Sequence, residues 1–552
     1  MSGRREKAAW GRAGAGTAAP GQRAARPFAL APVTELEDAE RARLLRRNAV
    51  YVIAGAVLFA AIYGLLSWLK YRAYMDARFD LGNMVQAVYN TAHGHFLEIT
   101  TGELKPRQMS RLGSHVDPIL ALFALPWLVW PSPVMLLVLQ AVIVATGAWP
   151  AYRLGTRVTR DPRAGALLAG AYLLYPALGF LVLNEFHPVA LATPLLLWAF
   201  LYLEGGRWLW ALPFLVLAAA CKETAPLVIG TMGVYFAIRK RSWRPLILTA
   251  AGAAYFAVAV WVIIPHFNGD QSAFIARYGD YGQGAGGVVT TAVTHPGQTV
   301  ADLAALGNLD YWLKLLWPLG FTSVLSPLTA LIAAPELLLN ALSATTFQRR
   351  IEFHYTALEI PFLFAAAVLG VMRLWRWLGG GFRRVEKAMA GQRVRRETLA
   401  LLVLLAALAG NYVMGPLPFS LPGAGYDGKD YARTAHTAAL DEAVSMIPTG
   451  AKVSANNNAG AQLAARRVVY VFPYFAGADW VLVDEKHPFF YDKENEEMHQ
   501  LALGKLVLDS RFVSVYAKDG VYVFKRVAPN PGALQGGDAP QAAPTPGVSP
   551  TP

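Results

Sequence analysis

Long apolar stretches that return along the whole chain limit its fold more than any other feature of the sequence. A helix needs about 20 apolar residues to cross a bilayer, and we assign eleven stretches to spans of this kind. Charged residues make up only 16% of the chain, against about 25% in an average soluble protein. The sequence therefore predicts an α-helical membrane protein with about eleven spans. The predicted spans are roughly 49–69, 132–150, 165–183, 188–204, 208–221, 224–238, 245–264, 311–325, 327–342, 357–374 and 398–415.

Two pairs of these spans are short. They meet at Cys221 and at Ser326, and each pair is also compatible with broken or re-entrant helices.

The distribution of charge orients the spans. If the N-terminus lies in the cytoplasm, the inner segments are strongly basic, whereas the rest of the chain holds slightly more acidic than basic residues. This asymmetry is the positive-inside pattern of membrane proteins. It accounts for the net charge of +13, so membrane lipids are expected around the chain and no nucleic acid is needed as a partner. The longest predicted external loops are then 70–131 and 265–310.

The same reading divides the chain into four parts. Residues 1–48 form a basic cytoplasmic segment that we expect to be largely disordered, and residues 49–415 form the membrane domain. Residues 416–527 alternate between strand and helix patterns, which predicts a small external α/β domain. Residues 528–552 are rich in Pro and Ala and are expected to be a disordered tail. Within 416–527 the patterns predict a helix at 431–447, strands at 451–455, 468–472 and 480–484, a helix at 495–503 and a hairpin through 512–525.

Asp80 is the acidic residue that raises the first functional question. It follows the first predicted span almost directly, in the string RFDLGNMVQAVYNTAHG. The pattern of residues 79–92 predicts an amphipathic helix on the external membrane surface, with Asp80 turned away from lipid. A solvated polar face without chemistry is an equally good interpretation of this helix taken alone.

Further ionisable residues leave the membrane at the same predicted level. Burying such groups near a bilayer is costly, so they usually pair or serve a function. For Lys222 and Glu223, a structural ion pair is at least as good an interpretation as a ligand contact. Glu336 is expected to be a buried carboxyl that hydrogen-bonds across helices. The candidates for substrate binding are His115, Glu185, His187, Lys222, Glu223, Arg349, Arg350, His354 and Tyr355.

Two chemistries fit a cluster of carboxylates and cations at the outer face of a membrane. In the first, Asp80 is a general base that deprotonates an acceptor hydroxyl. Three cations would then neutralise the phosphate leaving group of a lipid-linked donor. They are Arg349, Arg350 and Lys222.

In the second chemistry, acidic residues and histidines hold a divalent metal such as Mg²⁺ or Mn²⁺. The candidate ligands are His115 with Asp117 and Glu185 with His187. Each pair is spaced by two residues, which suits a loop or a strand better than a helix. This spacing is a weak metal motif.

Several separated motifs resemble one known family. They are FDLGNMVQAVYNTAHG, SRLGSHVDPILALFALPWLVWPSPVMLLVLQA, NEFHPVALATPLLLWAFLYLE, KETAPLVIG, APELLLNALS, IPTGAKVSANNNAG and ADWVLVDEK, in this order. Over about 70–527 the chain resembles the DUF2079 family of bacterial and archaeal membrane proteins, which is grouped with the GT-C glycosyltransferases. The resemblance implies a GT-C-like fold in the inner membrane of a bacterial cell. The eleven-span topology places the C-terminal domain outside.

The resemblance also implies a reaction. GT-C enzymes move a sugar from a polyprenyl-phosphate donor to an external acceptor, with an acidic residue in the first external loop as catalytic base. Asp80 matches that residue by position, and Asp117 is a second acidic candidate in the same loop. The acceptor, whether glycan, lipid or protein, is not implied.

Two non-catalytic functions compete with this reading. A scaffold would present the 416–527 domain but would leave the outer polar cluster without a purpose. A transporter would need ionisable groups aligned near the midplane of the membrane, where only Glu336 and Lys314 are expected. The sequence therefore favours a glycosyltransferase over both alternatives.

Overall fold

The computed structural model describes residues 38–102, 106–269, 277–278, 281, 290–291, 293–382, 395–486, 492 and 496–529. The chain divides into two compact units, 1–43 and 44–552, and the account below concerns the second. The disorder expected for 1–48 and 528–552 concerns mainly residues outside the described ranges. Much of the predicted loop 265–310 lies outside them as well.

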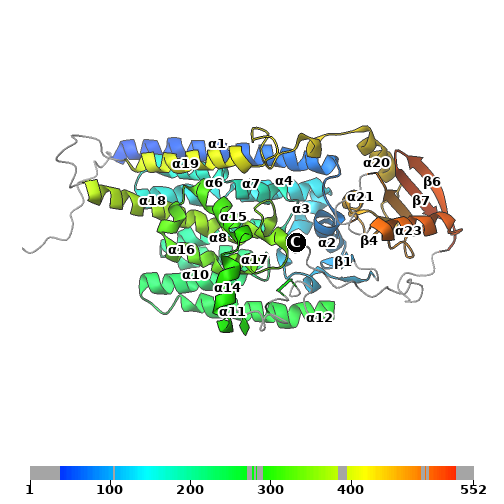
Figure 1. The fold of residues 1–552 in the computed structure, drawn as a ribbon, viewed down its shortest axis with the longest axis horizontal. Helices are drawn as coiled ribbons and strands as arrows, with labels where there is room; N and C mark the ends of the chain where they lie inside the picture. The colour runs from blue at the N-terminus through cyan, green and yellow to red at the C-terminus, as the bar shows by residue number, and fades with distance from the viewer. Residues whose placement is uncertain are drawn as a thin grey trace, which may run out of the picture. The chain divides into compact units, whose positions relative to one another are not determined.

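Helices dominate the part of the chain that was predicted to lie in the membrane (Figure 1). Five of the described helices are long and apolar enough to cross a bilayer, or six if one bent pair counts as a single span. The predicted number of eleven spans is therefore not confirmed. The main helices are α1 (Asp38–Arg72), α4 (Pro133–Ala145), α5 (Ala148–Thr159), α6 (Pro162–Leu173), α7 (Pro176–Leu183), α8 (Pro188–Glu204), α9 (Trp208–Ala219), α10 (Ala225–Lys240), α11 (Leu246–Val258), α15 (Leu306–Leu316), α16 (Pro327–Ala330), α17 (Ala334–Ala341), α18 (Ile360–Phe382) and α19 (Arg396–Met414).

Proline explains several of the helix breaks. A proline lacks the N–H that continues a helix and disfavours helical geometry at the residue before it, but it fits the first turn. Pro176 opens α7, so α6 and α7 meet at a bend of 45°. Pro327 likewise opens the short α16 after Ser326. The predicted spans around Ser326 thus form several short helical pieces, as in the broken-helix alternative.

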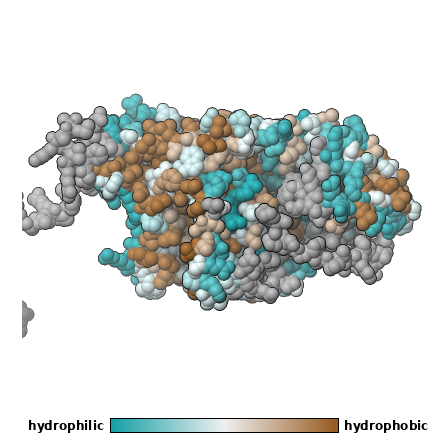
Figure 2. Space-filling model, viewed as in Figure 1, coloured by the Kyte–Doolittle hydropathy of each residue, from teal (hydrophilic) through white to brown (hydrophobic). Residues whose placement is uncertain are grey.

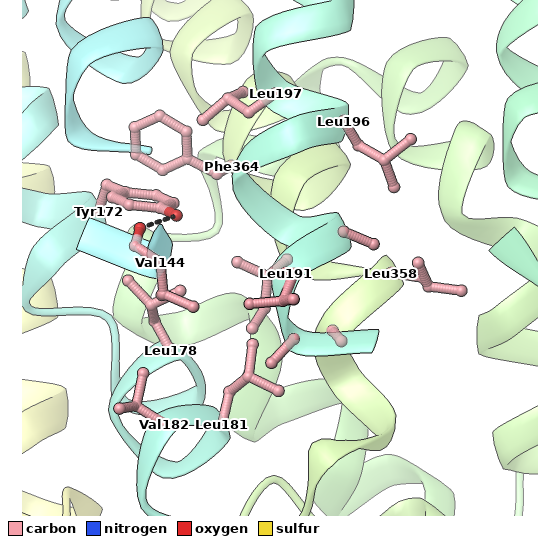
Figure 3. Close-up of a cluster of buried hydrophobic side chains, with 14 of the residues drawn as sticks. Val144, Tyr172, Leu178, Leu181, Val182, Leu191, Leu196, Leu197, Leu358 and Phe364 are labelled. Carbon is pink, nitrogen blue, oxygen red and sulfur yellow. Dashed lines mark hydrogen bonds between the residues drawn. The ribbon is translucent and has the colours of Figure 1, made fainter. Parts of the chain in front are cut away.

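A large apolar cluster joins the helices in the interior (Figure 3). Leu178 and Leu181 of α7 and Leu191 of α8 are fully buried in this cluster. The Tyr172 hydroxyl donates a hydrogen bond to the Val144 carbonyl at 3.2 Å, which satisfies the one polar atom of that side chain in an apolar surrounding. These contacts fix α4, α7 and α8, and therefore fix the loop between α7 and α8.

Apolar side chains also cover part of the outer surface. Figure 2 shows hydrophobic residues gathered over the helical part of the face in view. Leu209 is 84% exposed and Trp243 is 77% exposed. Large exposed apolar areas of this kind mark a surface that meets lipid or a partner, in agreement with a membrane protein.

A five-stranded sheet lies near the C-terminus, in the order β4-β3-β5-β7-β6. β3 pairs in parallel with β4 and β5, whereas β7 pairs antiparallel with β5 and β6. The sheet and its helices, residues 435–526, are called the C-terminal α/β region below. Its elements are α20 (Ala435–Ser445), β3 (Val453–Ala455), α21 (Asn457–Gln462), β4 (Val469–Val471), β5 (Trp480–Asp484), α23 (Glu496–Leu508), β6 (Phe512–Lys518) and β7 (Val521–Arg526).

The helix after the first span differs from the prediction. A π-helical turn, η1 (Arg78–Gly82), leads into α2 (Asn83–Ala92). Much of α2 is buried, and Gln86 and Asn90 are fully buried. Both side-chain amides donate to the carbonyl of Arg467, at 2.8 and 3.4 Å. α2 is therefore packed on that side by the C-terminal α/β region and is not the surface helix that was expected, whereas Asp80 stays 30% exposed.

Candidate functional site

The candidate site is built on the loop between α7 and α8, residues 184–187. Pro188 opens α8 and so ends the extended stretch that precedes it. Gln140 of α4, which is fully buried, holds the loop from inside. Its amide nitrogen donates to the carbonyls of Val182 and Glu185, at 3.1 and 2.5 Å, and its oxygen accepts the His187 N–H at 2.9 Å. A buried amide that satisfies this much backbone makes the loop rigid.

Glu185 fastens the Asp80 turn to this loop. Its backbone lies in the left-handed region, with φ of 55°, which is uncommon for a residue other than glycine and is kept only where the surroundings enforce it. One carboxylate oxygen accepts the N–H of Ala77 at 3.1 Å and the other accepts the N–H of Leu81 at 2.7 Å. Glu185 therefore binds the backbone before and after Asp80 by hydrogen bonds.

Asp80 itself faces His187. The side chain of Asp80 is 30% exposed, and its Oδ1 lies 3.5 Å from Nε2 of the buried His187 ring. Nδ1 of His187 lies 2.7 Å from the carbonyl of Asn184. A carbonyl only accepts hydrogen bonds, so Nδ1 carries a proton and Nε2 is the nitrogen that meets the carboxylate. Asp80 is thus an accessible carboxylate with an acid–base partner behind it.

His354 covers the other face of the His187 ring. The two imidazoles stack with centroids 3.6 Å apart. Asn184 Oδ1 accepts from the His354 backbone N–H and lies near its Nδ1, both at 3.0 Å. Burial lowers the pKa of His354 well below its usual value, and the nearby His187 and Lys222 lower it further. The His354 ring is therefore held neutral at physiological pH.

Three carboxyl groups, those of Asp76, Asp80 and Glu185, lie close enough at this turn to interact electrostatically. Asp76 is buried, and burial raises its pKa to about 6; Lys70 partly offsets the increase and Asp80 adds to it. Burial also raises the pKa of Glu185 well above its usual value, with further contributions from Asp80 and Asp76. Buried carboxyl groups with raised pKa values, such as Asp76 and Glu185, are typical of functional sites.

Asp117 and His115 lie in separate pairs. Asp117 is buried, and its Oδ2 accepts from Nε and Nη2 of Arg111, both at 2.8 Å. Burial raises the pKa of Asp117, which Arg111 partly offsets. His115 Nδ1 lies 2.9 Å from the Glu223 carboxylate. Burial would raise the pKa of Glu223, but His115 and Lys222 outweigh it and hold that pKa at about 2.

Lys222 joins the site to the interior. Its ammonium donates to Glu336 at 3.1 Å and lies 5.8 Å from the centre of the Tyr355 ring. Glu336 is thus a buried carboxyl bonded across helices. The Tyr355 hydroxyl accepts from Arg277 Nη1 at 3.5 Å. Two cationic groups, Lys222 and Arg277, therefore lie near His354.

The two arginines of the predicted phosphate site differ in their surroundings. Arg350 is exposed, lies 3.4 Å from the Glu352 carboxylate and has its guanidinium 5.6 Å from the Phe353 ring centre. Arg349 is half-buried at the end of a 3-10 turn, and no carboxylate pairs with it among the described residues. Arg349 is therefore the better placed of the two to receive an anion.

The predicted metal ligands are not gathered around one point. Glu185 binds backbone N–H groups and His187 faces Asp80, whereas His115 and Asp117 pair with Glu223 and Arg111. Within the described ranges, no three His, Cys, Asp or Glu side chains are arranged to hold a metal ion. The residues do not fit a metal in this arrangement, so no chemical step below uses one.

Sequence reasoning found most of these residues but missed several that complete the site. Asp76, Lys70 and Gln140 were not predicted, although Asp76 stands one helical turn before Asp80. That spacing was the one available signal. Gln140 lies within an apolar stretch, where a lone amide gives no indication of its partner.

Comparison with known proteins places the chain in a family. A family model described as "Predicted membrane protein (DUF2079)" matches residues 72–523. No curated protein matches the chain. The solved structure of the arabinofuranosyltransferase AftD from Mycobacteria is similar with a TM-score of 0.45 and 15% identity, over 86% of this chain and 40% of that one. The chain thus spans less than half the length of that protein, and so distant a likeness says nothing about activity.

The family match covers most of the chain, including the Asp80 turn, the α7–α8 loop and the C-terminal sheet. This protein therefore belongs to the DUF2079 family of membrane proteins.

Proposed function

We propose that this protein is a glycosyltransferase of the bacterial inner membrane. It would move a sugar from a polyprenyl-phosphate donor to a hydroxyl group of an acceptor on the outer face. The observation that carries the proposal is the setting of Asp80. Its carboxylate is 30% exposed on a turn whose backbone Glu185 grips, and His187 lies behind it at 3.5 Å. The resemblance to GT-C enzymes, which use an acidic residue at this position, agrees with it.

The reaction needs one base and one anion site. Asp80 takes the proton of the acceptor hydroxyl while that oxygen forms the new bond to the anomeric carbon of the sugar. The bond from that carbon to the phosphate oxygen breaks, and the electron pair leaves with the phosphate. Positive charge near the leaving group stabilises it. In this proposal Arg349 supplies that charge, and Lys222 and Arg277 lie near His354. Lys222 is already paired with Glu336, so Arg349 carries most of this role.

A rigid base lowers the barrier because it needs no reorganisation during the reaction. Glu185 fixes the backbone of the turn, and the Asn184 carbonyl fixes the His187 tautomer. His187 then accepts or shares the proton that Asp80 takes. His354, held neutral by burial, adds no second positive charge beside it.

A transporter remains the second candidate because of one buried polar network. Glu359 is fully buried and accepts hydrogen bonds from the Tyr311 hydroxyl at 2.6 Å and from Asn340 at 2.8 Å. Ionisable groups inside a membrane domain often mark an ion path. All three members satisfy one another, however, which a structural network also explains.

Transfer from radiolabelled polyprenyl-phosphate sugars, measured with the purified full-length protein in liposomes, tests the proposal. The wild type should transfer label to an added acceptor extract, and Asp80→Asn should lower the rate about 10²–10⁴-fold. Asp310→Asn is the matched control, because Asp310 is 60% exposed and pairs only with Lys314 among the described residues. No transfer by the wild type from any of the common sugar donors, or equal rates for both variants, would refute the proposal.

A further inference from the structure

The turn that carries Asp80 also carries a buried arginine. Arg78 is 1% exposed. Its Nη2 donates to the carbonyl of Thr100 at 2.5 Å, to the carbonyl of Val469 at 3.1 Å and to Gln86 Oε1 at 3.3 Å. All three partners are neutral, and burial lowers the pKa of Arg78 to about 10. Keeping a charged group in this position is costly, so the position needs an explanation.

One partner of Arg78, Val469, lies on an edge strand of the C-terminal sheet, whereas Thr100 and Gln86 belong to β1 (Glu98–Thr100) and α2. β4 is an edge strand, so one row of its backbone groups has no neighbouring strand. Thr100 Oγ1 accepts the N–H of Val469 at 3.2 Å, while Arg78 donates to the carbonyl of the same residue. Gln86 donates to the carbonyl of Arg467 at 2.8 Å. Side chains from the 78–100 stretch therefore complete the edge in place of a strand.

Close backbone contact adds to these hydrogen bonds. α21 packs against η1, and a Cβ atom added at Gly460 would lie 2.7 Å from Cβ of Arg78. A Cβ added at Gly82 would lie 3.1 Å from Cδ of Arg78 and 3.4 Å from Cα of Ala461. A separation of 2.7 Å is shorter than carbon atoms tolerate, so only glycine at position 460 lets α21 approach the turn this closely.

Two more contacts fasten the same region to the segment before the turn. The Gln462 amide donates to the carbonyl of Tyr71 at 2.5 Å, and the Tyr74 hydroxyl donates to Asp441 at 2.9 Å. The Asp80 turn is thus held from two sides, by Glu185 on one and by the C-terminal α/β region on the other.

We infer that the C-terminal α/β region is a working part of the site, and that Arg78 is the positioning residue through which it holds the Asp80 turn. Arg78 touches no reacting atom; it fixes the backbone that presents Asp80. Losing its contacts loosens the turn, which lowers the turnover rate and leaves donor binding unchanged, because the anion site is built elsewhere. The effect on turnover rests on the proposed function, whereas the effect on the mobility of the turn does not.

Hydrogen exchange of the full-length protein, followed at the backbone amides of 78–86, tests the mobility directly. Arg78→Gln should exchange about tenfold faster there, since it loses the guanidinium nitrogen Nη2 that donates to all three acceptors. Gly460→Ala should give a smaller increase, because one methyl group pushes α21 off the turn. Arg467→Gln is the matched control: that side chain is 59% exposed and pairs with Glu98 at 3.5 Å, so the exchange rate at 78–86 should equal that of the wild type.

Transfer assays give the second readout. kcat should fall about 10–100-fold in Arg78→Gln, as expected for a slightly misplaced base, with the KM for the donor unchanged. If Arg78→Gln exchanges faster at 78–86 but the wild type transfers no sugar, the proposed function is overturned. The inference that Arg78 holds the turn then still stands. If Arg78→Gln exchanges faster along the whole chain, the variant is misfolded. The exchange rate at 78–86 in Gly460→Ala then tests the inference. Unchanged exchange at 78–86 in Gly460→Ala, or in a folded Arg78→Gln, overturns the inference.

Discussion

Oδ1 of Asp80 lies 3.5 Å from Nε2 of His187, on the side of the imidazole opposite to the nitrogen that meets the Asn184 carbonyl. This relationship joins two parts of the chain that are far apart in sequence, the turn after the first span and the loop between α7 and α8. A carboxylate and an imidazole placed this close together are typical partners in acid–base catalysis. The pair is the part of the site that mutation tests most directly.

His187→Gln should separate the pair without removing the base. Glutamine keeps a polar tip but cannot take a proton, so the turnover rate should fall about 10-fold or more while Asp80 keeps residual activity. The KM for the donor should stay the same. His93→Gln is the control, because His93 is exposed and bonds only to the Tyr89 carbonyl of its own helix among the described residues. Equal turnover in both variants would show that His187 takes no part.

Asp117→Asn should lower the stability of the protein more than its turnover rate. The carboxylate is buried against Arg111. Removing its charge leaves the guanidinium buried beside a neutral partner, which lowers the free energy of unfolding by up to about 3–5 kcal/mol. We therefore expect a lower unfolding temperature and a turnover rate per folded molecule near that of the wild type. Loss of turnover with an unchanged unfolding temperature would move the role of base from Asp80 to Asp117.

The alternation of apolar and polar residues correctly predicted strands of the C-terminal α/β region. The predicted strand 480–484 coincides with β5, and the predicted hairpin after residue 511 forms β6 and β7. The short α21 was missed because its sequence NNAGAQ combines asparagine and glycine, both of which disfavour helix. It forms because tertiary contact with η1 outweighs its weak propensity.

The site shows the same limit. Asp80, His187 and His354 were all chosen from the sequence, since ionisable residues beside apolar stretches are uncommon. Which of them would meet was not predictable, because the three come from separate segments that only the packed helices bring together. The burial of α2 was not predictable for the same reason: Gln86 of this helix bonds to Arg467, which lies almost four hundred residues later.

Arg349→Ala should weaken binding of the lipid-linked donor. A charge-assisted hydrogen bond to phosphate contributes about 1.5–3 kcal/mol, so the Kd should rise about 10-fold or more. Arg349→Lys should recover only part of the affinity, since an ammonium lacks the planar fork. Arg350→Ala is the comparison, and its effect should be smaller because Glu352 already neutralises that charge. Unchanged affinity in Arg349→Ala and in the double alanine variant would exclude the anion site.

Reporter fusions test the predicted orientation. A reporter placed after residue 527 should lie outside the cytoplasm, and one within 378–395 should lie inside, because the inner segments carry the excess of Lys and Arg. Protease protection in sealed vesicles gives the side of each fusion. Two reporters on the same side would show that the number of spans between them is even, against the eleven-span topology.

Asp76 should make the protein less stable as the pH rises. Its carboxyl is buried, and its pKa in the folded protein is about 6, against about 3.9 in an unfolded chain. The folded state therefore binds the proton more tightly than the unfolded state. The contribution is most favourable below pH 4, is lost as the pH rises from about 4 to 6, and stays lost above that. The difference corresponds to about 3 kcal/mol at neutral pH.

Asp76→Asn removes this titration and keeps the shape of the side chain. The variant should match the wild type in unfolding temperature near pH 4 and exceed it at pH 7, by an amount that corresponds to about 1–3 kcal/mol. Asp310→Asn provides the control, because Asp310 is 60% exposed and pairs only with Lys314 among the described residues. Activity should not rise with the stability of Asp76→Asn, since the charge beside Asp80 changes as well. An advantage of equal size at both pH values would mean that Asp76 does not titrate in this window, and that its burial serves packing alone.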